Sequence, residues 1–213
     1  MANSLTRRRL LEWTSVVLAG WLVACDQGSR SADNRTKRSQ TLDLSSPAFE
    51  PEAFIPVEFT CDGADHSPAL SWSAPPEGTQ SFTLILDDPD APNGTFTHWV
   101  LYDLPPDSQS LPTAIPAQPF LTTGGVQGKN DFGQYGYRGP CLPRSSSLEN
   151  TSEENQGNQA NPTNSTHRYF FRLYALDTVL DLPPGVTSTE VRTALKDHIL
   201  AEAELMGRYK RQS

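Results

Sequence analysis

The sequence predicts an all-β sandwich. Short apolar segments alternate with proline- and glycine-rich turns, and the 213 residues include 18 prolines and 14 glycines, a content that favours a loop-rich β protein over a helical bundle. The segments at residues 82–86 and 99–104 are nearly continuous apolar runs, which indicates strands buried on both faces. Strands of this kind at short intervals are typical of two packed antiparallel sheets.

The first 25 residues are expected to be a signal peptide rather than part of the fold. Arginines at positions 7–9 precede a nine-residue apolar core at 16–24, far shorter than the roughly 20 residues that a membrane-spanning helix needs. Small residues before Cys25 resemble a bacterial lipoprotein cleavage site, and the arginines resemble a twin-arginine export signal. The alternative is an ordinary secretory signal in which Cys25 is incidental. The first interpretation predicts a lipidated Cys25 that anchors the exported protein to a membrane of the bacterial cell envelope.

Composition also separates two polar segments from the expected globular domain at 44–213. Residues 26–43 are predicted to be a flexible tether. Residues 145–166 contain five serines, five asparagines, three glutamates and no lysine or arginine. They cannot bury enough apolar surface to offset the entropy of ordering, so they are predicted to be a disordered insert. The net charge is −8 without a basic patch in the domain, which argues against nucleic acid as a partner.

The remaining elements follow in chain order. Apolar residues broken by prolines predict short strands at 49–59, and a further short strand is expected at 69–73. The apolar run at 167–176 is the strongest strand prediction. A capping box of Thr187 and Glu190 predicts a helix that starts near Ser188. Periodicity alone would extend that helix to Met206, with Gly207 as its stop.

Candidate site residues lie at the ends of the strongest strands. Asp88 and Asp90 lie on a loop stiffened by Pro89 and Pro92, and His98 begins the strand that follows. His167 begins another apolar strand. A single histidine in such a position more often has a structural role, but two of them near paired aspartates favour a shared pocket. His66 and His198 are expected to be solvated.

Several chemistries can be weighed for such a pocket. No short ligand spacing supports a metal, and no motif predicts a cofactor. A hydrolase with Cys141 as nucleophile and His167 as base is conceivable, yet no recognisable local signature surrounds Cys141. Binding fits better, because a protonated imidazole and backbone N–H groups of the glycine-rich residues 124–139 can hold a phosphate or carboxylate. Glycines alone would favour a plain surface loop over a binding loop.

After export, Cys61 and Cys141 are the two cysteines left in the domain. An even pair in an oxidising compartment is compatible with a disulfide. Two buried free thiols are an equal alternative, because spacing in the sequence does not show proximity.

The ordered motifs carry a family resemblance. Residues 88–92 (Asp-Pro-Asp-Ala-Pro), His98, Gly139-Pro140 and residues 167–169 (His-Arg-Tyr) occur in the order typical of phosphatidylethanolamine-binding proteins. Residues 60–63, 127–133 and 137–141 resemble the bacterial Raf-kinase-inhibitor-like branch, and the resemblance spans about residues 44–211.

This resemblance implies a Greek-key antiparallel β-sandwich with a short C-terminal helix and a closing strand at about 200–209. It implies non-enzymatic binding of a small anionic or phosphorylated ligand, with possible partners among kinases or proteases that the protein would modulate. The pocket residues carried over by motif are Asp88, Asp90, Pro92, His98, Tyr137, Gly139, Pro140, His167 and Tyr169. The alternative function is a hydrolase that uses Cys141 or the Asp88, Asp90, His98 and His167 cluster. The insert at 145–166 departs from the family pattern, since relatives usually have a short loop there.

Overall fold

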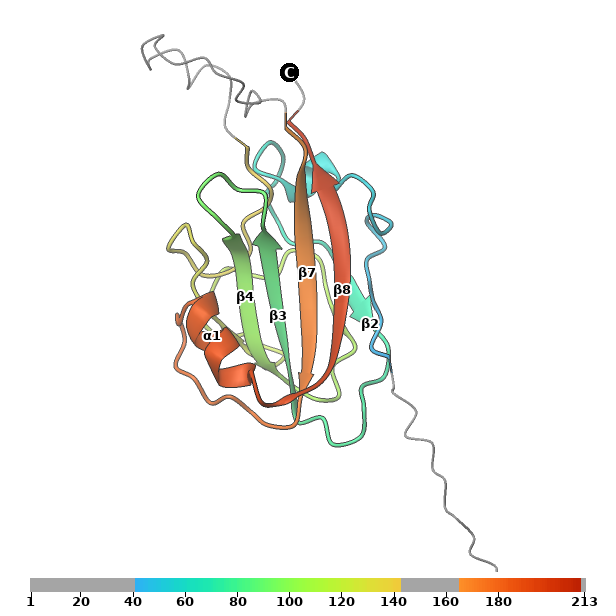
Figure 1. The fold of residues 1–213 in the computed structure, drawn as a ribbon, viewed down its shortest axis with the longest axis vertical. Helices are drawn as coiled ribbons and strands as arrows, with labels where there is room; N and C mark the ends of the chain where they lie inside the picture. The colour runs from blue at the N-terminus through green and yellow to red at the C-terminus, as the bar shows by residue number, and fades with distance from the viewer. Residues whose placement is uncertain (1–40, 143–164, 212–213) are drawn as a thin grey trace, which may run out of the picture. The chain divides into compact units, whose positions relative to one another are not determined.

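The computed structural model describes residues 41–142 and 165–211 (Figure 1). These residues form two antiparallel sheets, one α-helix and a short 3₁₀ helix, Val57–Phe59. The smaller sheet has the order β1-β2-β5, with bounds Leu44–Ser45, Leu70–Trp72 and Ser110–Leu111. The larger sheet has the order β6-β4-β3-β7-β8, with bounds Val126–Gln127, Phe96–Leu104, Ser81–Asp88, His167–Leu176 and Ile199–Tyr209. The predicted all-β sandwich is confirmed.

Strand β3 lies at the centre of the larger sheet, and all eight of its residues are buried. Because successive side chains point to opposite faces, Leu84 and Leu86 enter the core between the two sheets, while Ile85 enters a second core on the other face. The helix α1, Ser188–Leu195, covers this second core with Val191 and Leu195 (Figure 1). Burial on both faces therefore explains why the strand is a continuous apolar run.

The C-terminal region corrects the prediction from periodicity. The capping box forms as expected, since the Thr187 N–H donates to Glu190 Oε2 at 2.7 Å. The helix then ends at Leu195 instead of Met206, and β8 begins at Ile199. This segment pairs with β7, and every second residue is buried: Ala203, Leu205, Gly207 and Tyr209. The short helix and closing strand implied by the family resemblance are therefore confirmed.

The expected domain limits extend slightly at two points. Leu42, assigned to the tether, is buried in the core, and the Asp43 N–H donates to Ser73 Oγ. Ser165, assigned to the insert, contacts His167. The predicted signal peptide, nearly all of the tether and nearly all of the insert lie outside the described residues. Within residues 41–142 and 165–211, no helix is long and apolar enough to cross a membrane.

One end of the larger sheet gathers the predicted site residues. Strand β3 ends where β4 and β7 begin (Figure 1). The register pairs Asp88 with Phe96 across β3 and β4, and Asp87 with Phe170 across β3 and β7. Residues more than eighty positions apart in the chain therefore lie side by side at this end.

Candidate functional site

A cluster of four buried side chains occupies this end of the sheet: Asp88, His98, His167 and Tyr169. We refer to it as the His–Asp cluster. Its members come from β3, β4 and β7, so rigid strands rather than loops position them. The sequence predicted all four as site residues, and the structure brings them together.

Asp88 fixes the orientation of His167. Asp88 Oδ2 lies 2.8 Å from His167 Nδ1, and both side chains are less than a tenth exposed. The other oxygen, Oδ1, accepts the Asp90 N–H at 2.8 Å, which closes the tight turn through Pro89. Because a carboxylate oxygen accepts the hydrogen bond, Nδ1 of His167 carries the proton, and Nε2 lies 3.1 Å from Ser165 Oγ.

His98 is held by a backbone carbonyl. Its Nδ1 lies 2.8 Å from the Arg138 oxygen, so Nδ1 is protonated and donates. Burial lowers the pKa of His98, and this effect outweighs the opposing influence of the Arg138 carbonyl and the Asp88 charge. The imidazole is therefore neutral at neutral pH, with its one proton on Nδ1.

Tyr169 packs against His98. Its ring meets the His98 ring edge-on at 5.3 Å between centroids. Its hydroxyl is buried and has no partner with hydrogen-bond geometry among the described residues. Burial first, and the nearby Asp88 carboxylate second, raise the pKa of Tyr169, so the hydroxyl keeps its proton. It is a donor available within the cluster.

Asp90 is placed differently from Asp88. Its carboxylate binds Arg168 through both oxygens, at 2.9 Å to Nε and 2.7 Å to Nη2, and also accepts the Arg168 N–H. These bonds from Arg168 lower the pKa of Asp90. Asp90 thus ties the loop after β3 to the start of β7, and its oxygens are already occupied.

Gly139 and Pro140 directly follow Arg138, whose carbonyl holds His98. A Cβ atom at Gly139 would lie 2.1 Å from the Phe59 oxygen, so only glycine fits there. The Gly139 N–H donates to Asp65 Oδ1 at 2.7 Å, and the Pro140 oxygen accepts the Cys61 N–H. The expectation of a free N–H for an anion is therefore not met at Gly139.

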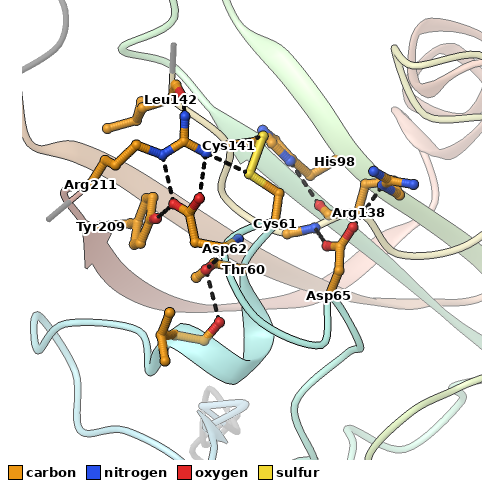
Figure 2. Close-up of a disulfide and its surroundings, with 12 residues drawn as sticks. Thr60, Cys61, Asp62, Asp65, His98, Arg138, Cys141, Leu142, Tyr209 and Arg211 are labelled. Carbon is orange, nitrogen blue, oxygen red and sulfur yellow. Dashed lines mark hydrogen bonds and ion pairs between the residues drawn. A yellow bond between two sulfur atoms is a disulfide. The ribbon is translucent and has the colours of Figure 1, made fainter. Parts of the chain in front are cut away.

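The Cys61 and Cys141 sulfurs form a disulfide, with 5.3 Å between the Cα atoms (Figure 2). The bridge joins the turn after the 3₁₀ helix to the segment that holds His98. Arg211 lies over the bridge, binds Asp62 at 2.6 and 2.8 Å and donates to the Leu142 oxygen. A bonded sulfur has no thiolate with which to attack, so Cys141 does not serve as a nucleophile in this state.

Two other predicted site residues lie at the margin. The Tyr137 hydroxyl donates to the Phe59 oxygen at 2.6 Å, and its ring packs edge-on against Trp99, so Tyr137 supports the cluster from the core side. Pro92 is exposed on the loop between β3 and β4.

Three residues beside the cluster were missed from the sequence. Phe96 and Phe132 meet the His98 ring edge-on at 5.2 and 5.6 Å, and Phe132 is 41% exposed. An aromatic residue within a glycine-rich loop was the available signal for Phe132. Ser165 lies 3.1 Å from His167 Nε2, but the polar composition around it pointed only to disorder. No group of His, Cys, Asp or Glu side chains in the described ranges has a geometry suited to a metal ion.

Fold and cluster together define a β-sandwich protein with a buried histidine–aspartate site at one end of its main sheet. The phosphatidylethanolamine-binding protein family model matches residues 45–210, and the chain belongs to this family. Among solved structures, the chain resembles CT736, a homologue of these proteins from Chlamydia trachomatis, with 36% identity and a TM-score of 0.66. The match covers 81% of this chain and 99% of that one.

Two relatives extend the comparison. A UPF0098 protein of Methanothermobacter thermautotrophicus is 45% identical over 170 residues, which cover 80% of this chain and 99% of the relative. LppC of Mycobacterium tuberculosis, whose name describes it as a candidate lipoprotein, is 35% identical over 172 residues. That match covers 81% of this chain and 74% of LppC.

Proposed function

We propose that the protein binds a small anionic or phosphorylated ligand at the His–Asp cluster without turning it over catalytically. The observation that carries this proposal is the 2.8 Å contact between His167 and Asp88 beside the buried His98 ring and the Tyr169 hydroxyl, which has no partner with hydrogen-bond geometry among the described residues. Together these groups offer an oriented imidazole, a second imidazole and a hydroxyl donor within one buried site. A phosphate or carboxylate accepts several such bonds at once.

The neutral state of His98 determines how this residue can bind an anion. With Nδ1 donating to Arg138, Nε2 gains a proton to donate only when the imidazole becomes cationic. An anion supplies the charge that favours this protonation. Binding of a fully ionised anion would therefore take up a proton at His98.

A thermal-shift screen with inorganic phosphate, phosphoethanolamine and sulfate tests the proposal. We expect a rise in Tm for the wild-type domain, and its loss in His98→Ala and His167→Ala. His198→Ala is a matched control, because His198 also lies 2.8 Å from an aspartate, Asp177, but away from the cluster. Equal responses in all three variants, or no response to any anion at millimolar concentration, would contradict the proposal.

We further propose that the protein is exported and anchored to a membrane of the cell envelope through a lipidated Cys25. Support comes from the signal pattern before Cys25 and from the name of the relative LppC. Metabolic labelling with a fatty-acid analogue should mark the wild type and spare Cys25→Ala. An unlabelled wild type would overturn this part.

The last part of the proposed function concerns a protein partner. The family resemblance implies a kinase or protease as partner, and we propose a partner of that kind for this chain. Pull-down from envelope extracts with and without saturating phosphate would test whether occupation of the cluster alters the contact. A set of captured proteins without any kinase or protease would oppose this component.

A further inference from the structure

A chain of hydrogen bonds extends from Asp88 through His167 to Ser165. Asp88 Oδ2 lies 2.8 Å from His167 Nδ1, and His167 Nε2 lies 3.1 Å from Ser165 Oγ. Ser165 lies two residues before His167, the first residue of β7, so the contact forms within one short stretch of the chain. The contact therefore follows from local geometry.

This arrangement has the three roles of an activated nucleophile. A hydroxyl within about 2.6–3.2 Å of an imidazole, which a third group orients, is the pattern by which proteins activate serine. Asp88 holds the proton on Nδ1, so Nε2 presents its lone pair to the Ser165 hydroxyl. His167 and Asp88 are buried, while Ser165 is partly exposed.

We propose that Ser165 is a nucleophilic acceptor site that small activated acyl esters acylate in a single stoichiometric step. The Ser165 proton passes to His167 Nε2 while Oγ forms a bond to the acyl carbon. The intermediate then expels the leaving alcohol, which takes the proton back from Nε2. The products are an ester on Ser165 and a free alcohol, and Asp88 remains ionised throughout.

The surroundings explain why the reaction stops at the acyl stage. Fast turnover needs free donors for the developing oxyanion, and the loss of one such donor alone lowers rates by about 10²–10³. Of the described residues, the N–H groups of Asp90, Gly139 and Arg168 near the cluster already donate to Asp88, Asp65 and Asp90. Attack by water on the Ser165 ester is therefore slow, and the adduct accumulates.

The test uses the mature full-length protein and p-nitrophenyl acetate. We expect one stoichiometric burst of p-nitrophenolate and an acetyl group that peptide mass spectrometry maps to Ser165. Ser165→Ala should abolish this adduct, and Asp88→Asn should slow its formation by about tenfold or more. Thr166→Ala is the matched control, because Thr166 is an exposed hydroxyl next in the chain, and it should label as the wild type does.

Two outcomes would overturn the inference. One is an adduct at Ser165 that forms as fast in Asp88→Asn as in the wild type, which would show an unactivated hydroxyl. The other is acetylation confined to lysines or histidines. The inference does not depend on anion binding: if Ser165→Ala keeps the phosphate-induced rise in Tm, ligand binding stands whatever the labelling shows.

Discussion

Nδ1 of His167 lies 2.8 Å from Oδ2 of Asp88, although 79 positions separate the two residues in the chain. The antiparallel pairing of β3 with β7 creates this contact, because Asp88 ends one strand where His167 begins the other. The register of the sheet therefore creates the site. A substitution of Asp88 or His167 alters the cluster directly.

Asp88→Asn should weaken phosphate binding by roughly 10- to 100-fold, the equivalent of about 1.5–3 kcal/mol for a hydrogen bond to a charged group. The asparagine amide no longer holds the proton of His167 on Nδ1. Nε2 is then no longer fixed as the ring nitrogen that offers the ligand a lone pair or, when the imidazole is cationic, a proton. Isothermal titration calorimetry with phosphate would measure the change. Asp177→Asn, which alters the corresponding pair with His198, serves as control. Equal losses in both variants would indicate a general effect on folding.

Sulfate affinity should increase as the pH falls from 8 towards 5. Burial lowers the pKa of His98 in the free protein, and a bound anion raises it again, so binding takes up a proton. Where one full proton is taken up, the affinity rises by about tenfold per pH unit. Sulfate is the suitable ligand because it does not itself titrate in this range. An affinity that is flat or falls with acidification would be inconsistent with this account of His98.

Asp90→Asn should destabilise the domain at pH 7 but not at low pH. The pKa of Asp90 is lowered in the folded state, chiefly by the Arg168 side chain. The sign follows from linkage: this stability is present above the unfolded carboxyl pKa of about 3.9 and disappears as the pH falls through the lower folded value. Urea denaturation of the two proteins should show separate midpoints at pH 7 that converge near pH 2. A gap that persists at low pH would assign the effect to packing.

Replacement of both Cys61 and Cys141 by serine should lower the free energy of unfolding by about 2–5 kcal/mol. Phosphate affinity should change less than about twofold, because three other bonds hold the same segments together. These bonds are Cys61 N–H to Pro140 O, Gly139 N–H to Asp65 and Tyr137 Oη–H to Phe59 O. Denaturation midpoints with and without reductant would measure the first effect. A large loss of affinity in the variant would show that the bridge positions His98.

The sequence predicted the fold well where one pattern dominated locally. The strand at 167–176 was placed to the residue, since a run dominated by aromatic and aliphatic residues strongly favours a strand. The prediction of a helix after Leu195, made from periodicity alone, was wrong. Pairing with β7 outweighs the helical spacing of Val191, Leu195 and Ile199. Such pairing is a tertiary effect that a local window does not contain.

The candidate site could likewise be predicted only in part from the sequence. Residue types and motif order identified Asp88, His98, His167 and Tyr169. Their individual roles depended on long-range partners: the Arg138 carbonyl that holds His98, and the Arg168 side chain that occupies Asp90. A backbone carbonyl has no sequence signature, so neither the tautomer of His98 nor its neutrality could have been predicted. The proximity of Cys61 and Cys141 is a further long-range fact of this kind.

Nuclear magnetic resonance of the four histidine imidazoles during titration with phosphate tests the central claim most directly. His66 and His198 lie outside the cluster and act as internal controls in the same sample. We expect the ring signals of His98 and His167 to move together and saturate at one common dissociation constant, while those of His66 and His198 stay in place. Unmoved signals of His98 and His167, or equal movement of all four histidines, would contradict the assignment of a specific anion site.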